Sequence, residues 1–180
     1  MSNMKNLLLL ILIAHLCLFN TAFQKSSLKF TVPPGWIEEE RTSSMRVAQY
    51  RLPKAEGDAE NGSVVLYYFG QGQGGSTVSN IERWVSQMKQ ADGGSSKAVA
   101  REERFEVNGL KVTTVDVGGT YVAETTPGSG TFENKPGYRL LAAVVETPNG
   151  SYFVKLLGPE KTVARWNESF LGYVKSFEFK

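Results

Sequence analysis

Two glycine-containing turns between β-type segments constrain the fold of this chain more than any other feature. The turns are Asn108-Gly109 and Pro148-Asn149-Gly150. Asn-Gly favours the tight turns with positive φ that join neighbouring antiparallel strands. The chain therefore predicts two β-hairpins, which is the order of an antiparallel sheet and not the βαβ order of a parallel one. The flanking strand segments are residues 99–107, 110–117, 138–146 and 152–157.

Two further segments have helical periodicity. In the first, apolar residues recur at the i, i+3, i+4 and i+7 spacing that places them on one face of a helix. Ser79 and Glu82 have the spacing of a capping box at its start, and Gly93-Gly94 supplies a stop. The second helix follows Gly158-Pro159, because proline fits the first helical position. The apolar stripes are Ile81, Trp84, Val85 and Met88 in the first helix, and Val163, Trp166, Phe170, Val174 and Phe177 in the second.

The rest of the chain supplies more strands and one long loop. The uniformly apolar residues 64–69 predict a central strand, since a strand covered on both faces need not alternate. Residues 124–137 have no periodicity and are rich in Gly, Pro and Thr, which is typical of a mobile loop. Two amphipathic helices must each bury a face, so we expect an α+β fold in which an antiparallel β-sheet is covered by two main helices. The remaining predicted strands are residues 28–32, 36–41, 46–52 and 177–179.

Residues 1–22 have the layout of a secretory signal peptide. Lys5 is a short positive region, residues 7–19 form a nearly unbroken apolar run, and Ala22 is a small residue before a cut. The apolar run is short for a membrane span. We expect cleavage between residues 22 and 27, export to the periplasm or the medium, and a single domain over residues 23–180. The alternative is an uncleaved N-terminal segment that anchors the chain and gives its only membrane contact.

Cleavage there removes the single histidine and the single cysteine, His15 and Cys17. Lipidation of Cys17 is disfavoured, because a lipobox has a small residue before the cysteine and this chain has Leu16. Without these residues, disulfides, Cys/His zinc sites, thiol nucleophiles and imidazole bases are absent. The 20 Lys and Arg against 18 Asp and Glu are well mixed, which gives no electrostatic reason to expect nucleic acid. No run matches a calcium loop, and we predict no metal ligand and no cofactor.

A short opening motif, F-x-x-P-x-G-W, is formed by Phe30, Pro33, Gly35 and Trp36. With the strand pairs, central helix, hairpins and closing helix that follow, the chain resembles the PsbP-like α/β/α sandwich proteins. That fold includes an extrinsic subunit of photosystem II, a small Ran-GTPase-binding protein and many exported bacterial proteins. The stretches RVAQYRLP, GD, YYFGQGQGG and NIERW are most similar to the exported bacterial group. The resemblance implies no catalytic residue, and the better-known relatives act by binding protein partners.

A glycine-rich stretch between the central strand and the first helix matches the spacing G-x-G-x-x-G. A dinucleotide site needs such a loop inside a βαβ unit, with an acidic residue at the end of the next parallel strand. Here the next extended segment, residues 101–107, is heavily charged and leads into a hairpin, and no Walker lysine follows Gly75. We therefore interpret the stretch as a strand-to-helix joint and expect no nucleotide. Its backbone N–H groups still form a candidate anion- or partner-binding loop. That loop consists of Gly70, Gln71, Gly72, Gln73, Gly74, Gly75 and Ser76.

Two acidic clusters, Glu38-Glu39-Glu40 and Glu102-Glu103, lie on predicted strands. A carboxylate pair hydrolyses glycosides when its members are suitably separated across a cleft, and a sequence does not give that separation. We interpret the first cluster as a solvated strand face beside Arg41 and Arg46, and the second in the same way. Neither cluster is predicted to be catalytic.

The three tryptophans indicate packing more than a carbohydrate platform. Trp84 and Trp166 fall on the apolar stripes of the two helices, which predicts core positions for both. Trp36 lies beside a turn, and the sequence leaves its position open.

These observations predict an exported, non-enzymatic binding or accessory module that acts through loops at one edge of the sandwich. Its partner is another envelope protein or a small ligand. The alternative is a carboxylate-dependent hydrolase of the cell envelope, which is disfavoured because acid–base catalysis near neutral pH most often uses imidazole. Carboxylates that converge inside a deep pocket would favour the enzyme. A shallow surface with exposed apolar residues would favour the binding module.

Overall fold

The computed structural model describes residues 27–126 and 128–180. The predicted signal peptide, the cleavage region up to residue 26, and both His15 and Cys17 lie outside the described residues. The elements, in chain order, are β1 (Leu28–Lys29), β2 (Ile37–Glu38), β3 (Arg46–Leu52), β4 (Gly62–Tyr68), α2 (Thr77–Ser86), β5 (Met88–Lys89), α3 (Ser96–Val99), β6 (Arg101–Val107), β7 (Leu110–Glu124), β8 (Phe132–Thr147), β9 (Gly150–Pro159), α4 (Glu160–Lys175) and β10 (Glu178–Phe179).

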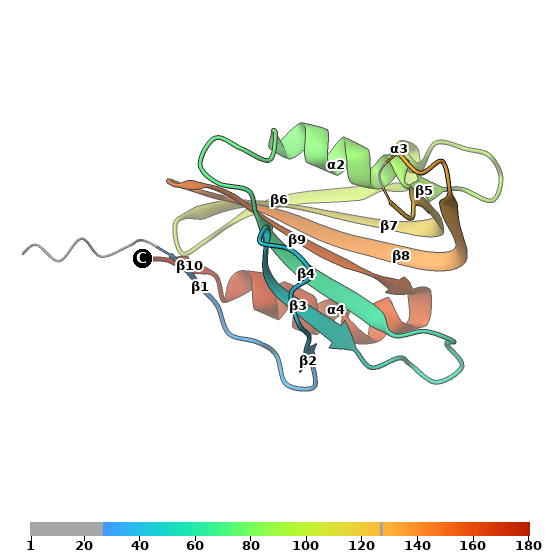
Figure 1. Ribbon diagram of the computed structural model, residues 1–180, viewed down its shortest axis with the longest axis horizontal. Helices are drawn as coiled ribbons and strands as arrows, with labels where there is room; N and C mark the ends of the chain where they lie inside the picture. The colour runs from blue at the N-terminus through green and yellow to red at the C-terminus, as the bar shows by residue number, and fades with distance from the viewer. Residues whose placement is uncertain (1–26, 127) are drawn as a thin grey trace, which may run out of the picture.

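One large sheet forms the centre of the molecule (Figure 1). Its strand order is β2-β3-β4-β9-β8-β7-β5, and β6 pairs with β7 beside β5. Every pairing between described strands is antiparallel, as the hairpin turns predict. β4 lies between β3 and β9, which confirms the interior position predicted from its apolar run. The short strands β1 and β10 pair with each other in a separate two-stranded sheet.

Alternate residues of the strands pack on opposite faces of this sheet. On β8, Leu141, Ala143 and Val145 belong to the apolar cluster that contains the buried face of α4. Leu140, Ala142 and Val144 belong to the cluster that contains the buried face of α2. The fold is thus mixed α/β, with an antiparallel sheet and three helices among the described residues. None of the helices in residues 27–126 and 128–180 is both long enough and apolar enough to cross a membrane.

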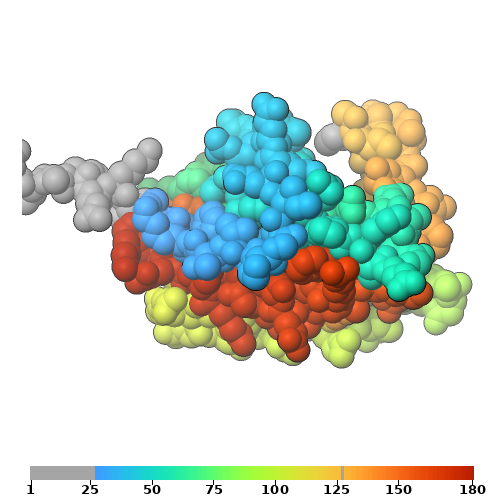
Figure 2. Space-filling model, turned by 90° about the horizontal axis from the view of Figure 1, so that it is seen from below, coloured from blue at the N-terminus to red at the C-terminus, as the bar shows by residue number. Residues whose placement is uncertain are grey.

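Helix α4 lies along one face beside the N-terminal part of the chain, as Figure 2 shows in red and blue. Its first turn is held by Asp58, whose Oδ2 accepts hydrogen bonds from the Thr162 backbone N–H at 2.8 Å and the Thr162 hydroxyl at 2.6 Å. A carboxylate at this position accepts hydrogen bonds from free N–H groups and interacts favourably with the helix dipole. The predicted stripe is buried throughout, although Pro159 is the N-cap residue and Phe177 lies past the helix end.

Helix α2 both begins and ends earlier in the chain than the sequence predicts. Its N-cap is Ser76 rather than Ser79, because the Ser76 side chain accepts the hydrogen bond from the Ser79 backbone N–H. The helix ends at Ser86, well before Gly93-Gly94. Met88 is therefore not on the helix, as predicted, but in β5, where its side chain is still buried in the α2 cluster.

Both hairpins are confirmed. Val107 pairs with Leu110, and the turn residues Asn108 and Gly109 have φ of 47° and 78°, the left-handed values that Asn-Gly tolerates. Thr147 pairs with Gly150, so Pro148 and Asn149 form the second two-residue turn.

The long mobile loop predicted over residues 124–137 is wrong in its extent. β7 continues to Glu124 and pairs there with Phe132 of β8, so the strands extend into the predicted loop from both sides. Pro136 and Gly137 fall opposite the register shift between Gly119 and Tyr121, where a bulge relieves the need for regular ladder hydrogen bonds. The Glu124 carboxylate also accepts hydrogen bonds from the backbone N–H groups of Gly128 and Gly130, which ties the loop to its own strand.

Candidate functional site

The predicted binding loop, residues 70–76, joins β4 to α2 as a strand-to-helix connection. Its glycines have positive φ, including 104° at Gly70 and 88° at Gly74. A Cβ on Gly74 would lie 2.7 Å from the ring of Phe153, so this position also needs glycine for packing. Local conformation and close contact account for these glycines without a cofactor.

The polar groups around this loop are already engaged with one another. The side-chain N–H₂ of Asn80 donates to the carbonyls of Gly74 and Ser76, at 2.7 and 3.0 Å. The Glu146 carboxylate accepts a hydrogen bond from the Thr77 hydroxyl at 2.9 Å. The protein's own carboxylate thus stands at the first turn of α2, where an anion would otherwise be favoured. Binding of an external anion by residues 70–76 stays a prediction.

We expect no nucleotide to bind at this loop. The strands after α2 are antiparallel, so the required βαβ unit is missing from this part of the chain. A thermal-shift screen of the protein with NAD, NADP, FAD, ATP and GTP at millimolar concentration should leave the melting temperature unchanged. A saturable shift that disappears in a Gly72→Val variant that still folds would contradict this interpretation; folding must be checked, because Gly72 has a φ of 70°. A small shift with phosphate alone would support the anion loop.

The first acidic cluster lies on a strand edge, but its partner differs from the prediction. Glu39 forms an ion pair with Arg51 on β3 at 3.3 Å, rather than with Arg41 or Arg46. Gln49 donates a hydrogen bond to the same carboxylate and accepts one from Arg46. The antiparallel pairing of β2 with β3 brings these side chains together, which sequence spacing alone does not reveal.

The tryptophans are all core residues. Trp84 is 3% exposed and Trp166 is 9% exposed, which confirms both predictions. Trp36, which the sequence left open, is buried against Tyr50 and Tyr173, with ring centroids 5.4 and 5.0 Å away. No tryptophan among the described residues therefore supplies an exposed aromatic platform.

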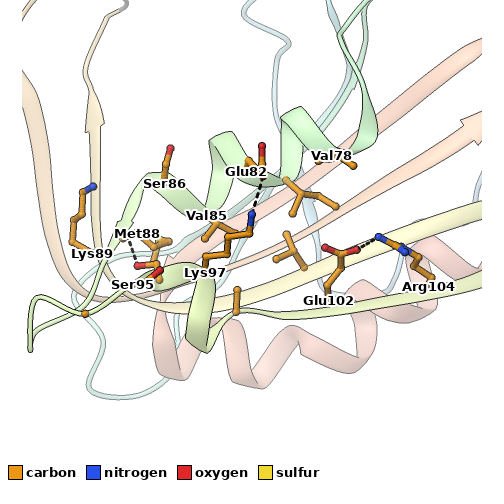
Figure 3. Close-up of a pocket in the computed structure, with 15 residues that line it drawn as sticks. Val78, Glu82, Val85, Ser86, Met88, Lys89, Ser95, Lys97, Glu102 and Arg104 are labelled. Atoms are coloured by element: carbon orange, nitrogen blue, oxygen red, sulfur yellow. Dashed lines mark hydrogen bonds and ion pairs between the residues drawn. The ribbon is translucent and has the colours of Figure 1, made fainter.

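Another open site is a groove of about 600 Å³ between α2, α3 and the edge of the sheet (Figure 3). We call it the α2–β6 groove. Its elements are fixed by Gln90, whose side-chain N–H₂ donates to Ser96 Oγ at 3.0 Å and to the Gly118 carbonyl at 2.9 Å. The Ser96 hydroxyl in turn donates to the Met88 carbonyl at 2.6 Å. These bonds hold α3 against β5 and β7 and so define one wall of the groove.

The floor of the groove is apolar. It is contributed by α2, β5, the end of α3 and β7, and its side chains are Ile81, Val85, Met88, Ala100 and Val115. Val78 lines the groove too and is 58% exposed, which leaves an apolar side chain open to solvent. Exposed apolar surface beside a concave apolar floor is typical of a binding site.

Two ion pairs stand among the lining residues. Glu82 on α2 faces Lys97 on α3 at 2.9 Å, and Glu102 lies beside Arg104 on β6 at 2.6 Å (Figure 3). The hydrogen bond that Lys97 donates to the Glu82 carboxylate raises the pKa of Lys97. Each carboxylate of the groove is thus paired with a cation, in contrast to the free carboxylates that acid–base catalysis needs. In residues 27–126 and 128–180 no three His, Cys, Asp or Glu side chains gather as a metal site.

The sequence interpretation missed this groove. Glu102 was assigned only to a solvated strand face, and Glu82 only to a helix cap. One usable signal was the apolar Val78 next to the helical stripe. It makes the apolar face of α2 wider than the face that packs against the sheet. The other was the Ala98-Val99-Ala100 run, which is apolar but too short for a core element.

No protein-family model and no curated protein sequence matches this chain. Several solved structures are similar to it, and two of them are described here. One is LpqN, involved in cell envelope biogenesis of Mycobacterium tuberculosis, at 10% identity and a TM-score of 0.51, covering 86% of this chain and 84% of LpqN. The other is cyanobacterial PsbP (CyanoP) from Synechocystis sp. PCC 6803, at 14% identity and a TM-score of 0.50, covering 85% of this chain and 86% of CyanoP.

At these identities the likeness concerns the fold. The chain has a PsbP-like fold, as the F-x-x-P-x-G-W opening and the order of elements predict.

Proposed function

We propose that this protein is an exported, non-enzymatic binding module of the cell envelope and that its ligand binds in the α2–β6 groove. The observation that carries the proposal is the apolar floor of Ile81, Val85 and Val115 beside ion-paired charges. In this proposal α2 and α4 form the two outer layers of an α/β/α sandwich. The groove lies beside α2. LpqN, which shares the fold, is described as involved in cell envelope biogenesis, and this supports the envelope setting.

The groove favours an amphipathic small ligand. A cavity of about 600 Å³ lies within the range of roughly 300–1,000 Å³ that small-molecule sites occupy. The apolar part of the ligand would lie on the floor, where each buried CH₂ contributes about 0.8 kcal/mol. The polar end of the ligand would contact Lys97 or Arg104 while both ion pairs stay at least partly formed.

Saturable binding of 11-(dansylamino)undecanoic acid, followed by its fluorescence, tests the proposal. Ala100→Phe places an aromatic ring at the floor and is expected to weaken binding by at least about tenfold, which is about 1.4 kcal/mol. Ala98→Phe is the matched control, because Ala98 is exposed on α3 and does not line the groove. Equal binding by both variants, or no saturable binding by the wild type, would contradict the proposal.

The alternative function is a carboxylate-dependent hydrolase of the cell envelope. The observation in its favour is that Glu82 and Glu102 both line the groove. Both carboxylates are already engaged in ion pairs, Glu82 with Lys97 at 2.9 Å and Glu102 with Arg104 at 2.6 Å. We therefore place the binding module first.

Export is the second part of the proposal and has its own test. Mass spectrometry of the protein from the periplasm or medium of an expressing bacterium should find an N-terminus between Ala22 and Ser27. A chain recovered intact from the cytoplasm would contradict export, and it would restore His15 and Cys17 to the available chemistry.

A further inference from the structure

The charged residues that line the α2–β6 groove do not balance. Three of them are cations and two are carboxylates, namely Lys89, Lys97 and Arg104 against Glu82 and Glu102. Glu82 is paired with Lys97, and Glu102 is paired with Arg104. Within residues 27–126 and 128–180 no ion pair includes Lys89. The excess positive charge of the groove therefore resides on Lys89.

This excess cation lies at one end of the groove (Figure 3). Lys89 of β5 lies on the side of Ser86 and Ser95, whereas Val78 and Arg104 lie at the opposite end. The side chains of Lys89, Ser86 and Ser95 are all exposed, so a ligand in the groove can reach them. An ammonium donates up to three hydrogen bonds and a serine hydroxyl donates one. This end of the groove thus offers a positive charge and hydrogen-bond donors.

The carboxylates closest to Lys89 in the sequence are engaged elsewhere. Asp92 follows β5 but does not line the groove, and its Oδ1 accepts a hydrogen bond from the Gly94 N–H at 2.8 Å. Glu82 lines the groove and is paired with Lys97 of α3. An anion that binds at Lys89 therefore does not have to displace a carboxylate of the protein.

The opposite end of the groove suits a hydrocarbon chain. Val78 is 58% exposed there and extends the apolar floor that Ile81 and Val115 begin. The charges at this end, Glu102 and Arg104, neutralise each other at 2.6 Å. Covering exposed apolar surface with an apolar chain is favourable, because that surface is removed from water. The groove is therefore polarised along its length, with a cationic end and an apolar end.

We propose that the ligand of the α2–β6 groove is an amphiphile with an anionic head, which binds with its head at Lys89 and its apolar chain over Ile81 toward Val78. This inference rests on the proposed function and deepens it, because it assigns the class of ligand and its direction in the groove. The head lies on the Lys97 side and not at Arg104. Lys89 determines specificity, since it favours an acid over a neutral or cationic amphiphile of the same length. A carboxylate and a phosphate monoester share this chemistry.

Competition by plain amphiphiles identifies the head. Dodecanoate and dodecyl phosphate, at micromolar concentration, should displace 11-(dansylamino)undecanoic acid from the full chain. The stronger of these two competitors distinguishes a carboxylate head from a phosphate head. Dodecyltrimethylammonium has a chain of the same length and should displace the probe much less, because Lys89 repels it. Equal displacement by this cation would overturn the proposal of an anionic head.

Two fluorescent probes that differ only in their head measure the contribution of the charge. They are 11-(dansylamino)undecanoic acid and its carboxamide. At low salt we expect the acid to bind about three- to fivefold more tightly than the amide, which is the range that exposed charge pairs contribute. This preference should shrink at high salt, because exposed charges are then screened. Equal affinities for the two probes would overturn the inference and leave the proposed function standing, and no saturable binding of either probe would overturn both.

Variants of Lys89 locate the head. Lys89→Gln should bind the acid as weakly as the amide, and Lys89→Arg should keep the preference for the acid. Lys175→Gln is the matched control, because it removes the same charge from an exposed position on α4, on the other face of the sheet. A preference for the acid that survives in Lys89→Gln would overturn the inference. Loss of that preference in Arg104→Gln would then place the head at the other end of the groove.

Discussion

Trp166→Ala is expected to lower the free energy of unfolding by roughly 3–5 kcal/mol, because the change removes a large apolar side chain and leaves a cavity. Trp166 is 9% exposed and packs in the α4 cluster. A Cβ on Gly35 would lie 2.9 Å from its ring, so the indole fits directly over the N-terminal segment. Its indole N–H also donates a hydrogen bond to the Pro53 carbonyl at 2.9 Å. The loss therefore affects helix, strand and N-terminal segment together.

Urea denaturation measures this effect, and Trp84→Ala gives the same test on the opposite face. Trp84 is 3% exposed and meets Phe153 edge to face at 6.4 Å. Glu168→Ala, on the exposed side of α4, is the matched control and should change stability by less than about 0.5 kcal/mol. Denaturation midpoints that stay unchanged in both tryptophan variants would show that these helices do not depend on their packed faces.

Gly119→Val is expected to destabilise the fold by about 3 kcal/mol or more. A Cβ at Gly119 would lie 2.6 Å from the carbonyl oxygen of Lys89, which belongs to β5. The residue also has a φ of 147° at the bulge in β7, a conformation that side chains rarely adopt. Overpacking and backbone strain each cost about 1–3 kcal/mol. Valine would push β5 from β7 and, with it, one wall of the α2–β6 groove.

The neighbouring glycine supplies the control. A Cβ at Gly118 meets its nearest atom, the Tyr138 carbonyl oxygen, at 3.8 Å, which is ordinary contact, and its φ is not in the left-handed region. Gly118→Val should therefore melt within a few degrees of the wild type, while Gly119→Val melts far lower or fails to fold. Similar melting temperatures for the two variants would contradict the described contact between β5 and β7.

Local sequence patterns correctly predicted the elements whose conformation is specified by residues close together in the sequence. Asn108-Gly109 marks its hairpin because its backbone conformation is specified by two residues. The stripe of α4 is readable because one helix face is buried along its whole length. Glu178-Phe179 was predicted as part of a last strand and pairs with β1 as β10.

The errors arose where distant segments decide the structure. Met88 fits the helical stripe of α2 by spacing, yet it joins β5 because Tyr121 of β7 offers it a strand partner. Pro136 and Gly137 indicate a loop by composition, yet the bulge in β7 accommodates them inside a long hairpin. The α2–β6 groove is lined by residues that all fall within 78–115, but they come from α2, β5, α3, β6 and β7, so no single motif points to it.

An amide-resolved NMR titration of the full chain with 11-(dansylamino)undecanoic acid tests most directly whether the protein is a binding module that uses this groove. We expect saturable chemical-shift changes at the amides of Val85, Ser96, Ala100 and Glu102, and recovery of the acid chemically unchanged. Ala100→Phe should abolish the changes, and Ala98→Phe should keep them. Saturable changes confined to residues 70–76 or to the α4 face, or conversion of the acid to a product, would contradict the account.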